Sequence, residues 1–266
     1  MATMDALVRG TRIAYDDEGS GPPVVRLHGL TGSRASDDAT TAFDSAALVR
    51  AGRRVVRYDA RGHGRSGGEN VESDYAWPNL ALDLLALLDV WRADTVSGVG
   101  ASMGTATLLH AVTLAPQRFD RLVLTCPPTA WASRAAQTDT YRAGALFVER
   151  NGKDAFVRGM RVQPRPPVLA ESPEGLVDID EALLPSILRG AAASDLPAPE
   201  QIAAIRVPTL ILAWDGDPGH PVSTAERLHA LVPGSEMHVA RTPAELRTWG
   251  DRTVRFLGER VPGPLG

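Results

Sequence analysis

The chain has 266 residues, a formal net charge of −4, six histidines and one cysteine. A hydrophobic share of 44% against 23% charged residues is typical of a folded globular protein and excludes a disordered chain. The length suits one large domain or two small ones. Because a mildly acidic chain without a basic block lacks the clustered cations that bind a phosphate backbone, we expect no nucleic-acid partner.

The single cysteine, Cys126, cannot form an intramolecular disulfide, and no C-x-x-C pair offers ligands for a metal. The N-terminal segment has no apolar signal region, and the most apolar stretch, 80–91, is interrupted by two aspartates. These features predict neither export nor a membrane span, so we expect a cytoplasmic protein. Lys153 is the only lysine beside many arginines, which suggests the hypothesis of a GC-rich bacterial gene.

Short apolar runs alternate with longer helical patterns, which predicts an α/β fold with a mostly parallel central sheet. The first two runs, 6–8 and 12–15, are joined at Arg9-Gly10 and predict an antiparallel hairpin. Apolar residues at helical spacing predict core-facing helices over 73–91 and 103–114. The remaining expected strands are 24–27, 54–58, 95–99, 121–125, 209–213 and 236–239.

The alternation of strands and helices breaks in the middle of the chain, where helical and proline-rich sequence separates two expected strands. An insertion of roughly eighty residues is too long for a structureless loop. We therefore predict a helical lid over 129–205, inserted before the penultimate strand of a core formed by 1–128 and 206–266. Within the insertion, 131–154 is expected to be a helix and 163–175 a linker.

The strongest local signal is the sequence Gly100-Ala101-Ser102-Met103-Gly104, which directly follows an expected strand and opens an expected helix. A serine in such a tight turn must adopt strained backbone angles, and glycines two positions before and after it prevent side-chain clashes. The turn would raise the hydroxyl out of the sheet toward a pocket. The pattern predicts a nucleophilic serine; the alternative is a serine that merely begins a helix.

A second signal is Leu27-His28-Gly29-Leu30-Thr31 at the end of an earlier strand. Acyl transfer builds negative charge on a carbonyl oxygen, which two preset backbone N–H groups can stabilise. The amides of Leu30 and Met103 are the candidate donors, while His28 is interpreted as a structural hydrogen-bonding residue. A third segment, 58–67, is a tight charged turn that we assign to scaffolding.

These motifs, in this order, resemble the α/β-hydrolase superfamily over almost the whole chain. The resemblance includes the DxRGHGxS segment at 59–66 and implies Ser102 as the nucleophile, with the Leu30 and Met103 amides binding the oxyanion. It also places the acid of a catalytic triad in the loop after 209–213. Asp217 fits that place best through its D-P-x-x-P register, with Asp215 as the alternative.

The general base departs from the family pattern, which has a histidine a few residues past the last strand. Here no histidine follows His238. Three accounts remain open: another histidine acts as the base, the serine works without one, or the site only binds. His220, three residues beyond Asp217, is the first candidate because triads are defined by geometry and not by chain position; His238 is the second. His110 and His229 are interpreted as packing or surface residues.

Other aromatic and sulfur-containing residues give weaker signals. Cys126 is interpreted as a small buried hydrophobic residue. Trp131 either lines an acyl pocket or anchors the insertion. Trp214 and Trp249 are assigned to packing.

The leading hypothesis is a serine hydrolase that cleaves an ester, thioester or lactone of a small, mainly apolar acid through a Ser102 acyl-enzyme. His220, oriented by Asp217, would move the proton, and no cofactor or metal is expected beside the small-molecule substrate. A serine nucleophile argues against halide displacement and epoxide opening, which use a carboxylate at the elbow. The alternatives are a non-hydrolytic cyclase, lyase or decarboxylase, and a catalytically silent ligand-binding protein.

Overall fold

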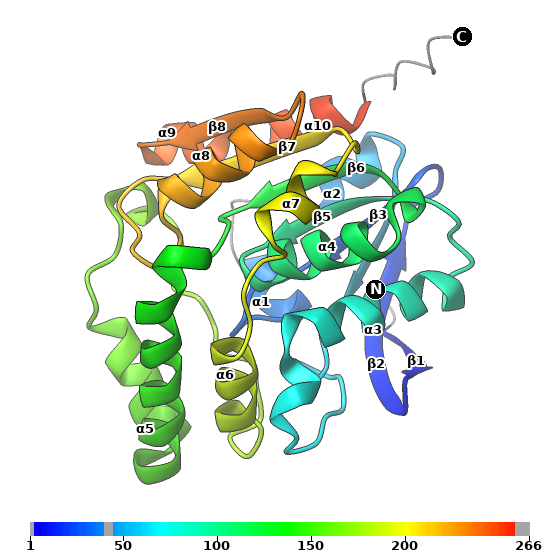
Figure 1. The fold of residues 1–266 in the computed structure, drawn as a ribbon. Coiled ribbons are helices and arrows are strands. Elements are labelled where there is room, and N and C mark those ends of the chain that lie inside the picture. The colour runs from blue at the N-terminus through cyan, green and yellow to red at the C-terminus, as the bar shows by residue number, and fades with distance from the viewer. Residues whose placement is uncertain (1–2, 40–44, 259–266) are drawn as a thin grey trace, which may run out of the picture.

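The computed structural model describes residues 3–39 and 45–258, and its centre is an eight-stranded sheet (Figure 1). Residues 1–2, 40–44 and 259–266, which the predicted core segments include, lie outside the described residues. The predicted α/β fold is confirmed: the strand order is β1-β2-β4-β3-β5-β6-β7-β8, and only the β1–β2 and β2–β4 pairs are antiparallel. The strands are Met4–Val8, Thr11–Glu18, Pro23–Leu27, Arg54–Tyr58, Val96–Ala101, Phe119–Thr125, Thr209–Trp214 and Glu236–Ala240.

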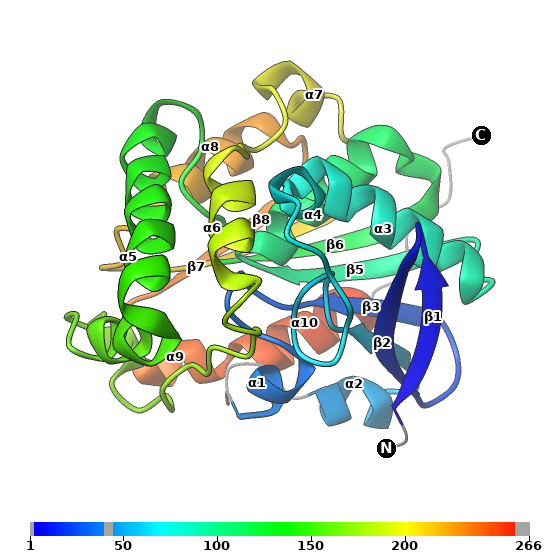
Figure 2. The same cartoon turned by 90° about the horizontal axis from the view of Figure 1, so that it is seen from below.

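Helices cover both faces of the sheet, as Figure 2 shows with the sheet between two layers. The buried faces of the strands carry Val, Leu and Ile, which pack against the apolar sides of the helices. One layer holds α3 (Trp77–Val90), α4 (Met103–Leu114), α7 (Pro199–Ala203) and α8 (Val222–Leu231). The other holds α1 (Arg34–Ala39), α2 (Ser45–Arg50), α9 (Pro243–Arg247) and α10 (Trp249–Gly258).

The expected helix over 73–91 is shorter in the structure. A 3₁₀ turn covers Glu72–Tyr75, Ala76 is extended, and α3 begins at Trp77. Pro78 explains the boundary, because proline has no amide hydrogen and is suited to the first turn of a helix. Amphipathic spacing alone therefore placed the start of this helix too early.

The insertion between β6 and β7 folds into helices that lie beside the main body of the molecule (Figure 1). Its long helix α5 (Arg134–Arg161) follows a 3₁₀ turn at Trp131–Ser133, and α6 (Leu184–Ala192) packs along it. Gly152 interrupts α5 with φ 80° and ψ 164°. The expected linker over 163–175 contains a short 3₁₀ turn, η4 (Pro167–Leu169). The role of the insertion as a lid stays a prediction.

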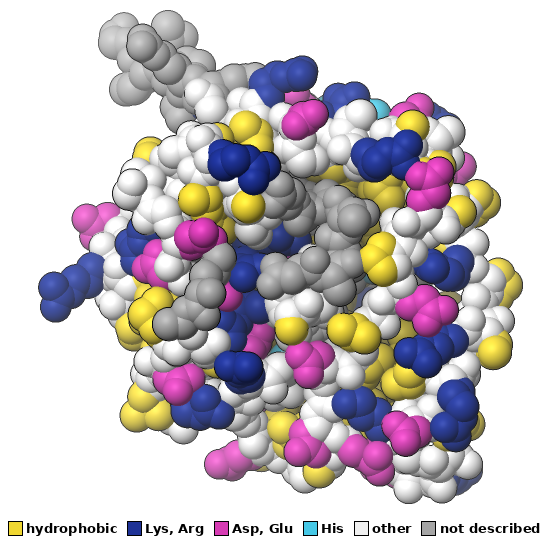
Figure 3. Space-filling view, turned by 180° about the vertical axis from the view of Figure 1, so that it is seen from behind, with side chains coloured by type: hydrophobic (Ala, Val, Ile, Leu, Met, Phe, Trp, Pro, Cys, Tyr) yellow, Lys and Arg dark blue, Asp and Glu magenta, His cyan; other side chains and the backbone are white. Residues whose placement is uncertain are grey.

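The face of the molecule drawn in Figure 3 carries no large patch of a single charge. On the face drawn in Figure 3, basic and acidic side chains are interspersed. Among the described residues, no helix is both long and apolar enough to cross a membrane.

Helix α4 approaches strand β3 through Gly104. A Cβ at this position would lie 2.5 Å from the carbonyl oxygen of Leu27 and 2.7 Å from its Cβ. Real Cβ atoms do not approach a backbone oxygen so closely, so only glycine allows this packing. Since α4 begins immediately after Ser102, the same close contact sets the position of the serine.

We predict that Gly104→Ala destabilises the fold by about 1–3 kcal/mol, because the added methyl group forces α4 away from β3. Gly159→Ala is the matched control: it is also in a helix, but its Cβ would meet nothing within 4 Å. There we expect a small gain of up to about 1 kcal/mol. Urea denaturation measures both, and equal effects of the two substitutions would contradict the packing argument.

Candidate active site

Ser102 occupies a strained turn between β5 and α4, with φ 52° and ψ −109°. Its amide donates to the Thr125 carbonyl oxygen (3.0 Å), which ties the turn to the neighbouring strand β6. A Cβ on Gly100 would lie 2.5 Å from the carbonyl carbon and oxygen of Gly104, so both glycines of the motif are required by packing. Strained backbone at such a turn is common at functional sites.

The loop after β7 brings the candidate acid and base to this serine. His220 Nε2 lies 2.7 Å from Ser102 Oγ, and His220 Nδ1 lies 2.8 Å from Asp217 Oδ2. The side chains of His220 and Asp217 are 24% and 19% exposed, so the pair is largely shielded from water. The structure therefore joins a hydroxyl, an imidazole and a carboxylate in one continuous hydrogen-bonded chain.

Asp217 is held as a carboxylate. Burial by itself would raise its pKa, but hydrogen bonds from His220, Trp214 and the Gly219 amide, with the charge of His220, outweigh burial and lower the pKa to about 2. An ionised carboxylate at this place favours the tautomer in which His220 carries its proton on Nδ1. Nε2 is then free to accept the proton of the Ser102 hydroxyl.

Trp214 has a larger part in the site than the packing role that the sequence predicted. Its indole Nε1–H donates to Asp217 Oδ2 at 3.0 Å, the oxygen that also faces His220. The ring stacks on Trp249, with centroids 5.7 Å apart and an interplanar angle of 11°. One sequence signal could have indicated this role. Trp214 lies at the end of a parallel strand, and ligands in α/β folds bind at the carboxyl ends of such strands.

The two expected oxyanion donors are backbone amides, one directly after the serine and one in the turn after β3. Met103 is the first residue of α4, so no carbonyl within the helix pairs with its amide, and the helix dipole favours negative charge there. The Leu30 amide donates no hydrogen bond within the described residues. The side chain of Met103 is buried in the core, so its contribution to the site is its backbone.

Two histidines hold the turn that carries Leu30. His63 Nε2 lies 2.6 Å from the Leu30 carbonyl oxygen, and His28 Nδ1 lies 2.7 Å from that of Gly29. His28 Nε2 accepts from the Ala60 amide at 2.9 Å. Burial is the main reason that the pKa of His63 falls to about 4, so its ring is neutral near pH 7. Neither ring contacts Ser102, in keeping with the structural roles expected for them.

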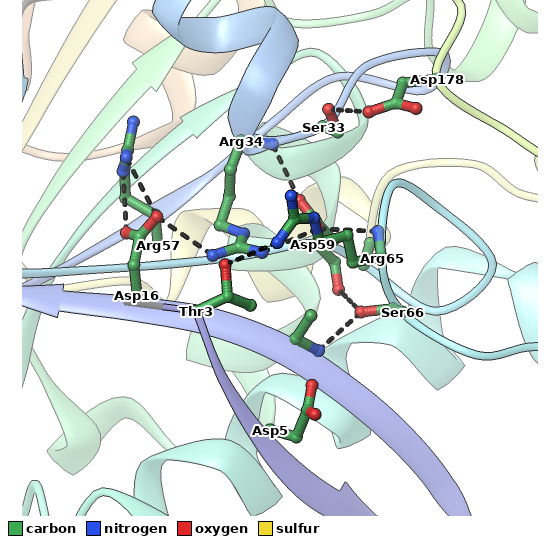
Figure 4. A network of polar contacts seen from close by, with 12 residues as sticks. Thr3, Asp5, Asp16, Ser33, Arg34, Arg57, Asp59, Arg65, Ser66 and Asp178 are labelled. Atoms are coloured by element: carbon green, nitrogen blue, oxygen red, sulfur yellow. Dashed lines mark hydrogen bonds and ion pairs between the residues drawn. The ribbon is translucent and has the colours of Figure 1, made fainter. Parts of the chain in front are cut away.

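A buried network of charged groups supports the same turn (Figure 4). Asp59 accepts from the Arg34 amide (2.9 Å), the Arg34 guanidinium (3.1 Å) and the Arg65 amide (3.0 Å). Arg34 also pairs with Asp16 at 3.0 Å, and Asp16 with Arg57 at 2.9 Å. Removing one partner of such a buried pair leaves an uncompensated charge. These contacts agree with the scaffolding role expected for the segment 58–67.

Ser102 and His220 open into a cavity of about 340 Å³. This size suits a small substrate, since ligand pockets begin near 300 Å³. One wall is formed by Trp214 and Trp249, and another by the expected linker of the insertion. The remaining lining residues are Arg26, Gly29, Asp37, Ala101, Thr125, Cys126, Arg165, Leu169, Ser172, Pro173 and Gly175.

The alternative acid and base lie apart from this constellation. Asp215 is exposed, and its carboxylate accepts from the adjacent Gly216 amide. His238 lies on β8, where its Nε2 is buried and has no hydrogen-bond partner among the described residues. His110 bonds to the Asp195 carbonyl oxygen and His229 to Ser235, so none of the four contacts Ser102.

Cys126 lies at the cavity, whereas Trp131 contacts the scaffold. Cys126 is buried and borders the cavity, and burial raises the pKa of its thiol well above the ordinary value. Trp131 is absent from the cavity lining; its indole N–H donates to the Pro197 carbonyl oxygen, which anchors the start of the insertion. No cluster of metal-ligating side chains occurs in the part of the chain that the structure describes.

Comparison with known proteins defines the class. The α/β hydrolase fold family model matches residues 22–244, which is most of the chain. The protein belongs to the α/β-hydrolase family. The proteins that it resembles include a diacylglycerol lipase and an enol-lactonase.

Two curated relatives illustrate the range of the family. The chain is 31% identical over 128 residues to an sn-1-specific diacylglycerol lipase of Xenopus tropicalis, covering 46% of this chain and 38% of the relative. It thus spans about two fifths of that protein. It is 26% identical to 3-oxoadipate enol-lactonase 1 of Acinetobacter baylyi over 194 residues, 70% of each chain.

Solved structures match more completely. A hydrolase from Pseudomonas aeruginosa superposes with a TM-score of 0.80 at 26% identity, covering 97% of this chain and 98% of its own. An enol-lactonase from Burkholderia xenovorans superposes with a TM-score of 0.79 at 22% identity, covering 96% of this chain and 100% of its own. This similarity shows a shared fold.

Replacing Asp217 with Asn tests the charge of this loop. The folded pKa of about 2 lies below the ordinary 3.8, so ionisation stabilises the fold by about 2 kcal/mol. Because the folded value is the lower one, this contribution is complete above about pH 5 and is lost as the pH falls through about 2. We expect the difference in unfolding free energy between wild type and Asp217→Asn to be constant at neutral pH and to shrink below about pH 4.

Urea denaturation over a pH series measures this difference. Other carboxylates also titrate in acid, but they are common to both proteins and cancel. A difference that does not change as the pH falls would contradict the lowered pKa of Asp217.

Proposed function

We propose that the protein is a serine hydrolase that cleaves an ester, thioester or lactone of a small substrate. Ser102 is the nucleophile, His220 is the general base, and Asp217 is the carboxylate of the triad. The observation that carries the proposal is the hydrogen-bonded chain from Ser102 Oγ through His220 to Asp217, with distances of 2.7 and 2.8 Å. A base within hydrogen-bond reach of the hydroxyl is what nucleophilic catalysis by serine requires.

The reaction proceeds in two halves. Ser102 Oγ attacks the substrate carbonyl carbon while His220 Nε2 takes the hydroxyl proton, and the Leu30 and Met103 amides bind the developing oxyanion. Asp217 stabilises the imidazolium that forms. Collapse of the tetrahedral intermediate breaks the bond to the leaving group, which takes the proton from His220. Water then attacks the acyl-enzyme by the same route and releases the acid.

The cavity supports a small substrate with apolar portions. Trp214 and Trp249 give it an aromatic wall, and Leu169 from η4 faces the same space. Because η4 belongs to the inserted segment, we propose that residues 129–205 act as a lid that limits the size of the bound acyl group. The non-hydrolytic alternatives were motivated by an absent base, and an imidazole bonded to Ser102 removes that motive.

A fluorophosphonate probe tests the nucleophile. We expect wild type to be labelled with one equivalent and Ser102→Ala to remain unlabelled, because only an activated serine attacks the probe. Ser172→Ala is the matched control, since Ser172 lines the same cavity without a histidine partner, and it should keep the label. Equal labelling of wild type and Ser102→Ala, or product formation that survives Ser102→Ala, would overturn the covalent mechanism.

Paired histidine substitutions test the base. We expect His220→Gln to lower kcat by at least about 10³-fold, because losing a triad member leaves the serine without a proton acceptor. His238→Gln should retain near wild-type kcat, since its ring does not contact Ser102. Steady-state hydrolysis of a 4-nitrophenyl ester measures both. Full turnover in His220→Gln would remove His220 from the mechanism.

A further inference from the structure

The cavity at Ser102 is lined by two cationic side chains, Arg26 and Arg165, that the proposed chemistry does not use. Arg26 has its partners within the protein. Its Nε lies 3.3 Å from Asp37 Oδ2, and its Nη1 donates to Ser45 Oγ at 2.6 Å. The pair with Asp37 balances the charge of Arg26, and both side chains are largely buried.

Arg165 differs from Arg26 because it has no acidic partner. Within residues 3–39 and 45–258, no carboxylate lies within ion-pair distance of its guanidinium. Its Nη2 contacts the carbonyl oxygens of Leu169, Ser172 and Pro173 at 3.0, 2.8 and 3.3 Å. These contacts position the side chain, and in that part of the chain Nε and Nη1 make no hydrogen bond.

The position of Arg165 puts this charge between two hollows. It lines the Ser102 cavity and also a second hollow of about 150 Å³, whose lining includes Thr31, the residue after Leu30. The other ionic groups lining the second hollow are Arg161 and Glu174, which pair with each other at 3.0 Å. The carboxylates that line the two hollows, Asp37 and Glu174, are each paired with another arginine. The charge of Arg165 is therefore not balanced by a lining residue.

Arg165 is exposed, and a substrate that fills the cavity it lines displaces part of the water around its guanidinium. Desolvating a charge is costly unless the incoming group compensates for it. A neutral acyl group gives no compensation, whereas a carboxylate forms charge-assisted hydrogen bonds with the free guanidinium nitrogens. The chemistry of the lining thus favours a substrate with one negative charge away from the reacting carbonyl.

We propose that Arg165 is the specificity-determining residue that binds a carboxylate carried by the substrate, so that the enzyme prefers a monoanionic ester or lactone. The proposal rests on the proposed hydrolase function and specifies its substrate class. The scissile carbonyl lies at Ser102, and the carboxylate of the same molecule points to Arg165 in the inserted segment. The insertion therefore supplies charge recognition in addition to apolar contact.

A matched pair of chromogenic esters tests the proposal: 4-nitrophenyl hydrogen glutarate, which is anionic, and its neutral methyl ester, 4-nitrophenyl methyl glutarate. For wild type we expect kcat/KM to favour the anionic ester by about tenfold or more. Arg165→Met should abolish most of this preference, and Arg165→Lys should keep part of it. Arg158→Met is the control, since Arg158 is an exposed arginine of α5 that lines neither hollow.

The ratio of the two esters separates charge recognition from a structural role of Arg165. If Arg165 only holds the 165–173 turn, its loss changes both esters equally and the ratio stays constant, which would overturn the proposal. A wild-type ratio of one or below would do the same. Failure of the hydrolase function itself looks different: neither ester would then be cleaved in a Ser102-dependent way.

Discussion

The hydrogen bond between Ser102 Oγ and His220 Nε2 joins segments 118 positions apart and sets the requirements for the rest of the fold. The serine must leave β5 in a strained turn, which needs the close approach of α4 to β3 at Gly104. The histidine must be held in place, which Asp217 in the loop after β7 does with the help of Trp214 at the end of that strand. Together these contacts keep His220 Nε2 within hydrogen-bond distance of Ser102 Oγ.

The oxyanion turn depends on a second set of buried polar contacts. His28 and His63 bind the carbonyl oxygens of Gly29 and Leu30, which fixes the backbone on both sides of the amide that we propose as an oxyanion donor. Asp178, from the insertion, accepts from Ser33 Oγ at 2.6 Å, and the Asp178 amide donates to the Thr31 carbonyl oxygen at 3.0 Å. The turn is thus held by both the sheet and the insertion, so the two parts are coupled at the site.

The sequence predicted the features that are encoded locally. The existence of the strands, the serine turn and the hairpin at Arg9-Gly10 follow from apolar periodicity and glycine spacing, and the structure has them. His220 was a candidate because it follows Asp217 by three residues. The hydrogen bond of Trp214 to Asp217 could not be predicted, because it depends on how the Trp214 ring stacks on Trp249 of α10. The lack of an acidic partner for Arg165 could not be predicted either, because it depends on which arginines the carboxylates of the insertion pair with.

The histidine expected after the last strand has been replaced by a different local structure. There Thr242 caps α9, accepting from the Glu245 amide, while Glu245 Oε2 accepts from the Arg241 and Thr242 amides. With β8 leading directly into a helix, the proposed acid and base lie on one loop, Asp217 to His220. Because the Thr129 amide donates to the Gly219 carbonyl oxygen at 3.1 Å, that loop is tied to the start of the insertion. The insertion and the loop that carries the proposed base are therefore joined by a direct backbone hydrogen bond, so the position of His220 depends on the insertion as well as on the sheet.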